Sequence, residues 1–358
     1  MNMLWTGLGA IAAVAAGAEG IARRAYRRKY LLPYLPKVIG EYPYKAFVQE
    51  TDMPLAYRYK KGFQSPMVTI NRFGLRGPEP SPDGAKKRFM IIGESDYFGA
   101  RLYKEEDLWS IRLNQILAAG DHKDWEALNG GSSVYNSLQH RVFWEQELHK
   151  VLPGILLIRI GGNDISQAWV MGSQWKPGAP WPLEFIHKLE RKRSHWRDIA
   201  EKSCAYHLLR GSSGPQKAGA FRRIDDDFQW DACLQSILDN HSALVRDAAR
   251  RGAKVAFLCL APAYDLHMSS DDQKRIAALQ ANWRFFVEGW AKYQFIMKDN
   301  VKELAEQLGI PFLDPRETIY RHPKRFRLYC DLGHFNADGH SLIARFLYGE
   351  IENLGWWG

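Results

Sequence analysis

From residue 88 onward, short apolar runs alternate with segments in which apolar residues recur at helical spacing. The runs are RFMIIG, WEALNGG, GILLIRIGGND, AKVAFLCLAP and PFLDP. Strands buried on both faces read as continuous apolar runs, and parallel strands are usually connected by helices. The alternation therefore predicts a doubly wound α/β fold, in which a parallel sheet lies between two layers of helices.

The rest of the chain divides around this alternation. Residues 1–30 hold an apolar segment with a basic flank, and residues 31–84 are rich in proline, tyrosine and turn signals, which favours a β-rich extension. We expect the α/β domain over 85–358. Within it, residues 165–226 break the rhythm with four tryptophans and a Gly/Ser-rich stretch. We interpret this insertion as a cap over the ligand site, with a surface loop as the alternative.

The N-terminal segment has the pattern of a weak membrane anchor. Residues 3–18 are uncharged, and five basic residues follow between Arg23 and Lys29. The apolar part is shorter than the ~20 residues of a comfortable transmembrane helix, and no basic residue precedes it as in a signal peptide. We predict a retained anchor, in preference to a cleaved signal or a soluble helix. The basic flank favours a cytoplasmic main domain, with an extracytoplasmic one as the alternative.

Charge and cysteine content narrow the choice of partners. The net charge of +9 and the isoelectric point near 9.2 favour an anionic partner. We expect the membrane surface, contacted through residues 3–29, because the chain has no helix-turn-helix, zinc-finger or RNP-like pattern for nucleic acid. No metal or other cofactor is predicted, since the cysteines show no metal-ligand spacing; they are Cys204, Cys233, Cys259 and Cys330.

Polar residues and glycines follow three of the predicted strands. Ser95 follows FMIIGE, Gly130–Gly131 ends WEALNGG, and Asn163 follows LLIRIGG. Because the carboxyl ends of parallel strands meet at one edge of the sheet, where ligands bind, these residues should lie close together. Asp331 and His334, in DLGHFNADGH, precede the last predicted helix and form a fourth group.

These residue types suit nucleophilic catalysis. A serine hydroxyl becomes a nucleophile when a base takes its proton, and histidine does this best when a carboxylate holds its other nitrogen. Asp331 and His334 lie three positions apart, so the carboxylate can hold the imidazole locally. Taken singly, each residue has a simpler explanation: Ser95 as a helix cap, Asn163 as a turn former and His334 as a loop histidine. His340, inside the last predicted helix, is expected to be structural.

The four groups together resemble the SGNH branch of the GDSL hydrolases, over roughly residues 65–355. The matching positions, in the order of the family's blocks, are Gly93-Glu94-Ser95, Asn129-Gly130-Gly131, Gly161-Gly162-Asn163-Asp164 and Asp331-Leu332-Gly333-His334. The resemblance implies a flavodoxin-like three-layer sheet of SGNH-hydrolase type. It also implies the site roles: Ser95 as nucleophile, His334 as base and Asp331 as its orienting carboxylate, with an oxyanion hole formed by the backbone N–H groups of Ser95 and Gly131 and the side chain of Asn163.

Two blocks depart from the family pattern. Glu94 stands where the family has aspartate, and Asp96-Tyr97 replaces a continuation that contains leucine. In the second block, Val134 occupies the position of a glycine, and Gly130 competes with Gly131 for the oxyanion role. The departures leave open what Glu94 does beside the serine.

The leading hypothesis is a membrane-associated serine esterase that cleaves an acyl or acetyl ester of a lipid-like or carbohydrate substrate through an acyl-enzyme. An O-acyltransferase would use the same residues with a sugar or lipid hydroxyl in place of water. A third possibility is a non-catalytic subunit that keeps the fold within a membrane complex.

Overall fold

The computed structural model describes the chain at residues 14–22, 24–25, 44–178, 229–264, 268–272 and 284–358. Within this part, five parallel strands form the central sheet, in the order β4-β3-β5-β6-β7. They are β3 (Lys87–Gly93), β4 (Trp125–Gly131), β5 (Ile155–Arg159), β6 (Lys254–Leu258) and β7 (Phe312–Leu313). This order confirms the predicted doubly wound, flavodoxin-like sheet. The chain reverses direction across the sheet between β3 and β5, the place where such folds bind ligands.

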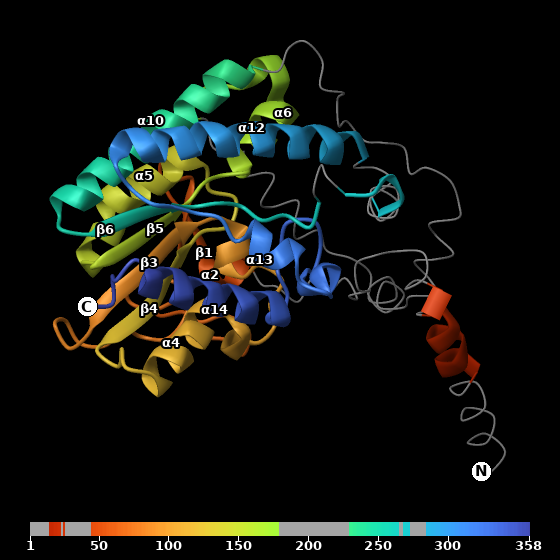
Figure 1. Cartoon of the computed structure of the whole chain (residues 1–358), viewed down its shortest axis with the longest axis horizontal. Coiled ribbons are helices and arrows are strands. Elements are labelled where there is room, and N and C mark those ends of the chain that lie inside the picture. The colour runs from red at the N-terminus through yellow and green to blue at the C-terminus, as the bar shows by residue number, and fades with distance from the viewer. Residues whose placement is uncertain (1–13, 23, 26–43, 179–228, 265–267, 273–283) are drawn as a thin grey trace.

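Helices cover both faces of the sheet (Figure 1). One face is covered by α4 (Trp109–Ala119) and α14 (Ala337–Asn353). The other face carries α5 (Ser137–Gln146), α6 (Asn163–Met171), α10 (Trp230–Arg250) and α12 (Arg284–Leu308). The shorter elements are α3 (Ser95–Phe98), α13 (Arg316–Tyr320), η1 (Glu105–Asp107), η2 (Leu148–Val151), η3 (Gly172–Gln174) and η4 (Arg325–Leu328).

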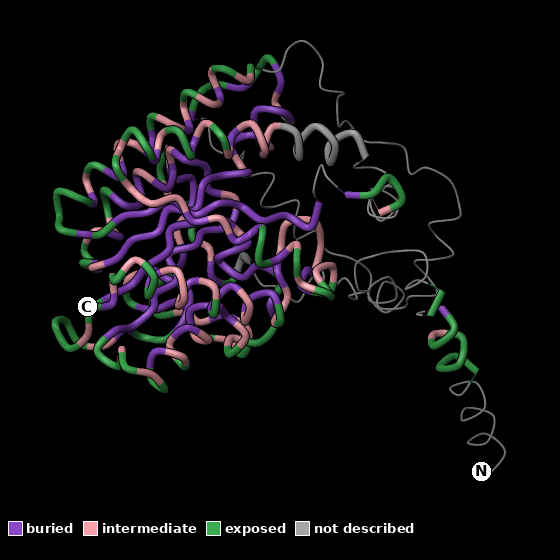
Figure 2. The backbone as a smooth tube through the Cα atoms, in the orientation of Figure 1, coloured by how far each residue is buried: buried purple, intermediate pink, exposed green. Residues whose placement is uncertain are grey.

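The strands of the central sheet are buried along most of their length, between two apolar cores (Figure 2). In β3, Phe89 and Ile91 pack in the core shared with α4 and α14, whereas Met90 and Ile92 pack in the core shared with α5 and α10. This division follows from the alternation of side chains along a strand. Because both alternating sets are apolar, β3 must lie inside the molecule, and its carboxyl end delivers the next residues to the edge of the sheet.

The extension before the sheet packs onto the segment that carries Ser95. Its described part, 44–84, contains α2 (Tyr44–Phe47) and the short antiparallel pair β1 (Val48–Glu50) and β2 (Tyr57–Tyr59). The Arg76 side chain is buried and donates hydrogen bonds to the carbonyls of Phe98 (3.1 Å), Gly99 (2.6 Å) and Met67 (2.8 Å). The extension therefore helps to fix the turn that follows the serine.

Much of the expected anchor and cap lies outside the described residues. Residues 14–22 are helical and mostly exposed, and residues 1–13 and 26–43 are not described. In the described ranges, no helix combines the length and apolar character needed to cross a membrane, so the predicted anchor gains no support. Of the predicted cap, residues 179–226 are not described, and Trp169 and Trp175 are buried. The cap and the cytoplasmic location stay predictions.

Candidate active site

Ser95 begins a short helix at the carboxyl end of β3. Glu94 is the N-cap residue of α3, with extended backbone, and Gly99 ends the helix in the left-handed region, at φ 81°. Ser95 is therefore the first helical residue rather than the cap. No described residue accepts its backbone N–H, as expected for the first turn of a helix. Its side chain is left to bond outside the helix.

The structure brings Ser95, His334 and Asp331 into one chain of hydrogen bonds. Ser95 Oγ lies 2.8 Å from His334 Nε2. On the other side of the ring, His334 Nδ1 lies 2.8 Å from Asp331 Oδ1 and 2.9 Å from Oδ2. The nucleophile–base–carboxylate spacing of a serine hydrolase is therefore present in the free protein.

The loop before α14 holds this acid–base pair. Asp331 Oδ1 accepts hydrogen bonds from the backbone N–H groups of Gly333 and His334, both at 2.9 Å. Asn336 then caps α14, as its side chain accepts from the Gly339 N–H at 3.1 Å. Turn and cap together orient the imidazole before the helix begins.

An arginine that the sequence analysis did not single out contacts Asp331. Arg101 Nε lies 2.9 Å from Asp331 Oδ2, although Arg101 itself is about half exposed, with 51% of its side-chain surface accessible. Its backbone has a φ of 73°, unusual for a residue other than glycine. Burial would raise the pKa of Asp331, but Arg101 and His334 outweigh it and hold the pKa well below its usual value. Asp331 is therefore ionised at neutral pH.

Asn163 is held by two hydrogen bonds, one of them to Glu94, the residue that precedes the serine. Its backbone N–H donates to Glu94 Oε1, and its Nδ2 donates to the Tyr135 carbonyl, both at 2.9 Å. Because a side-chain amide carries two hydrogens on its nitrogen, one of them is left for another acceptor. The structure thus keeps Asn163 available for the oxyanion role implied by the resemblance.

Gly131 lies where β4 meets α3. Its N–H donates to Asn129 Oδ1 at 2.9 Å, so this N–H already has an acceptor, and its oxyanion role stays a prediction. A Cβ at this position would collide with the backbone nitrogen of Phe98 in α3. Glycine is needed here because α3 and β4 touch backbone to backbone. Gly130 is also confined, since a Cβ there would lie 2.7 Å from the Ile91 carbonyl within the sheet.

Beneath the serine lies a buried cluster of charges. Arg159, the last residue of β5, pairs with Glu94 Oε2 through Nη1 and with Asp96 Oδ2 through Nη2, both at 2.9 Å. All three side chains are at most 5% exposed. Burial raises the pKa of Glu94 to about 7, although the Arg159 charge opposes the rise. Sequence reasoning missed this cluster, and the available signal was a charged residue ending the apolar run ILLIR.

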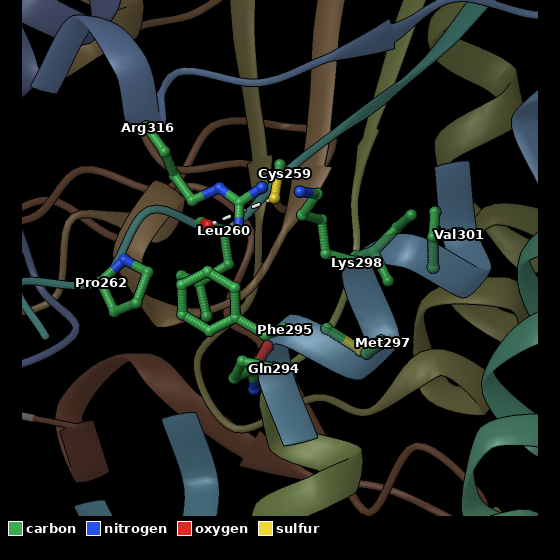
Figure 3. Close-up of a pocket in the computed structure, with 10 residues that line it drawn as sticks. Cys259, Leu260, Pro262, Gln294, Phe295, Met297, Lys298, Val301 and Arg316 are labelled. Atoms are coloured by element: carbon green, nitrogen blue, oxygen red, sulfur yellow. Dashed lines mark hydrogen bonds between the residues drawn. The ribbon is translucent and has the colours of Figure 1, made fainter. Parts of the chain in front are cut away.

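The edge of the sheet beyond β5 holds a small cavity (Figure 3). It is lined by Ile160, Cys259, Leu260, Pro262, Gln294, Phe295, Met297, Lys298, Val301 and Arg316. Its volume of about 10 Å³ is close to the space that one water molecule needs, so it is too small for an acyl group. Within the described residues, no three histidine, cysteine, aspartate or glutamate side chains are placed to hold a metal ion.

Comparison with known proteins places solved esterase structures among those similar to this chain. No protein-family model and no curated protein matches the sequence. A putative acylhydrolase from Bacteroides fragilis is 14% identical over 77% of this chain and 91% of its own, with a TM-score of 0.42. A GDSL-like lipase from Bacteroides thetaiotaomicron is 12% identical (76% and 91% covered, TM-score 0.42).

The acetylxylan esterase Axe2 from Geobacillus stearothermophilus is 14% identical, over 75% of this chain and 95% of its own, with a TM-score of 0.42. Likenesses of this size do not assign an activity. The function of this chain has to be inferred from the geometry of its own residues.

Proposed function

We propose that this chain is a serine ester hydrolase that works through an acyl-enzyme. The observation that carries the proposal is the hydrogen-bonded series Ser95–His334–Asp331, with 2.8 Å at each of its two links. It lies at the carboxyl edge of the sheet, where the β3–β5 reversal leaves a ligand site. A site that only bound a partner would have no need of this alignment.

In the first step, Ser95 Oγ forms a bond to the ester carbonyl carbon while its proton moves to His334 Nε2. The carbonyl π electrons move onto the oxygen. When the intermediate collapses, the alcohol oxygen leaves with the proton from His334, and the acyl group stays on Ser95. Water repeats the sequence, with His334 taking its proton, and releases the acid. Asp331 stays ionised throughout and stabilises the imidazolium.

The oxyanion of the intermediate needs donors that are already in place. The backbone N–H of Ser95 has no acceptor among the described residues, and Asn163 Nδ2 retains one hydrogen beyond its bond to Tyr135. We assign the oxyanion hole to these two groups, without Gly131. The substrate we propose is an acyl or acetyl ester of a lipid-like or carbohydrate alcohol.

A hydrolysis screen of acetyl to long-chain esters, on wild type and Ser95→Ala, tests the proposal. We expect wild-type turnover on part of the panel and its loss in Ser95→Ala. Faster product formation with added sugar or lipid hydroxyls, and transfer of the acyl group to them, would redirect the proposal to an O-acyltransferase. A folded wild-type protein that turns over no ester and co-purifies with a membrane complex would overturn it in favour of a non-catalytic subunit.

A further inference from the structure

Glu94 links the two residues assigned to the proposed oxyanion site. It directly precedes Ser95, yet its side chain makes no capping bond to α3. Instead it is buried, with Oε1 accepting from the Asn163 N–H and Oε2 paired with Arg159, both at 2.9 Å. The carboxylate thus connects the nucleophile turn to the start of α6.

The space for this connection is left by a glycine. A Cβ at Gly161 would lie 2.6 Å from Glu94 Oε1 and 2.8 Å from Asp164 Oδ2. Contacts this short between carbon and oxygen do not occur without a shift of the carboxylate. Gly161 therefore allows the Glu94 side chain to pass beneath the loop that carries Asn163.

Arg159 holds the far side of the carboxylate. Its guanidinium also bonds to Asp96 through Nε and Nη2, each at 2.9 Å, and to the Ile160 carbonyl at 3.1 Å. Fixed in this way at the end of β5, the guanidinium gives Glu94 a rigid partner rather than a mobile one. Charge-assisted hydrogen bonds of this kind are short and directional.

We propose that Glu94 is a positioning residue of the oxyanion site: held by Arg159, its carboxylate sets the Asn163 amide relative to Ser95. This inference rests on the proposed ester hydrolysis. Asn163 is then fixed at its backbone by Glu94 and at its side chain by the Tyr135 carbonyl, so the remaining amide hydrogen has one direction. Glu94 does not touch the substrate, and its effect passes through Asn163.

The proposed role depends on the length of the Glu94 side chain. Aspartate is shorter by one carbon–carbon bond, about 1.5 Å, and cannot keep both 2.9 Å contacts from the same backbone. Glutamine can keep the bond to Asn163 but turns an N–H group toward the Arg159 guanidinium. Alanine keeps neither contact. In each variant Arg159 retains Asp96 as its counter-charge, so no uncompensated cation is left in the core.

The test measures kcat and KM for ester hydrolysis in Glu94→Ala, Glu94→Asp and Glu94→Gln. Misplacing a donor of the oxyanion lowers kcat by about 10²–10³, so we expect a loss of that size in Glu94→Ala. Glu94→Asp should lose roughly ten-fold or more by the same reasoning, and Glu94→Gln less, because it keeps the acceptor for Asn163. KM should change by less than about three-fold throughout, since ground-state binding is untouched.

Glu126→Gln is the matched control. Glu126 is also buried, with Oε1 accepting from Arg88 Nε (3.1 Å) and Oε2 accepting from the Ser81 N–H (2.9 Å), at the opposite end of the sheet. Its kcat should equal that of wild type. The inference is overturned if the kcat of Glu94→Ala and Glu94→Asp stays within three-fold of wild type, or if Glu126→Gln lowers kcat equally. If Glu94→Ala fails to fold, the Glu94→Asp and Glu94→Gln pair decides. A wild-type protein without esterase activity refutes the proposed function itself.

Discussion

Two buried arginines at opposite ends of the sheet show how similar clusters can differ in purpose. Arg88, near the start of β3, bonds to Glu126 (3.1 Å), to the carbonyls of Val151 (2.8 Å) and Ser81 (2.9 Å), and to Asp83 (2.9 Å). Glu126 is buried and Asp83 is 74% exposed. One buried carboxylate therefore balances one guanidinium.

The Arg159 cluster is not balanced in this way. Glu94 and Asp96 are both buried against the single guanidinium, and Asp96 Oδ1 has no hydrogen-bond partner among the described residues. Where Glu94 ionises, above its raised pKa of about 7, the cluster holds an excess of buried negative charge, which costs stability. The Arg88 cluster therefore holds the extension against the sheet. The Arg159 cluster instead lowers the stability of the fold while it positions the residues of the candidate site.

The largest effect should come from removing the arginines themselves. Arg159→Met leaves two buried carboxylates without a counter-charge and should lower the free energy of unfolding by about 3–5 kcal/mol. Adding Glu94→Gln and Asp96→Asn should restore most of that loss, because no charge is then left buried. Arg88→Met should cost a similar amount without changing kcat in the folded fraction. Denaturant unfolding, together with activity assays, checks this. An equal loss of kcat in Arg159→Met and Arg88→Met would show that the two clusters do not differ in purpose.

Asn163→Ala tests whether residues at the carboxyl edge of the sheet affect catalysis more than residues at its opposite end. Loss of an oxyanion donor should lower kcat by about 10²–10³, with KM nearly unchanged. The matched variant is Asn114→Ala, since Asn114 bonds to both backbone groups of Ala127 near the start of β4, at 2.7 and 3.0 Å. That variant should cost about 1–3 kcal/mol in stability and leave kcat intact. Steady-state kinetics that show the reverse pattern would refute the assignment.

The pH dependence of stability should expose the charge imbalance. Between pH 4.5 and 7 the Glu94 carboxyl keeps its proton in the folded protein but loses it in the unfolded chain, because burial raises its folded pKa to about 7. The Glu94 contribution to stability is therefore present below pH 4.5 and is lost as the pH rises to 7. Glu94→Gln should become more stable relative to wild type across this window, by up to about 1.4 kcal/mol per pH unit. A pH-independent difference in urea unfolding would contradict this.

The smallest effect is expected for Arg101→Gln. Its guanidinium contacts Asp331 Oδ2 at 2.9 Å from a half-exposed position, so its removal should loosen the carboxylate that orients His334 and lower kcat by roughly two- to three-fold. Arg72→Gln is the control, since Arg72 makes an exposed pair with Glu79 at 2.9 Å in the extension. Steady-state kinetics that show an unchanged kcat for Arg101→Gln, or the same loss of kcat in both variants, would exclude this role.

The sheet could be predicted from the sequence, as could the residues Ser95, His334 and Asp331 that the structure brings together, but the ion pairs of Glu94 could not. Apolar runs such as RFMIIG predict strands from local sequence alone. The blocks that contain Ser95, Asn163 and Asp331/His334 follow one another in the order of the family that the sequence resembles. The partner of Glu94 could not be predicted, because Arg159 is 65 positions away and ion pairs leave no periodic pattern. The oxyanion role expected of Gly131 stays a prediction, because close contact with α3 and access to a ligand both demand glycine and the sequence cannot separate them.

The central claim is that Ser95 is a nucleophile activated by His334 and Asp331. Labelling with a fluorophosphonate, followed by peptide mass spectrometry, tests it most directly. We predict one adduct on Ser95 in wild type, none in Ser95→Ala, and labelling slowed by at least about 10²-fold in His334→Ala, because a general base contributes about 10²–10⁴. A folded wild-type protein without an adduct on Ser95, or one that labels equally fast without His334, would contradict the account.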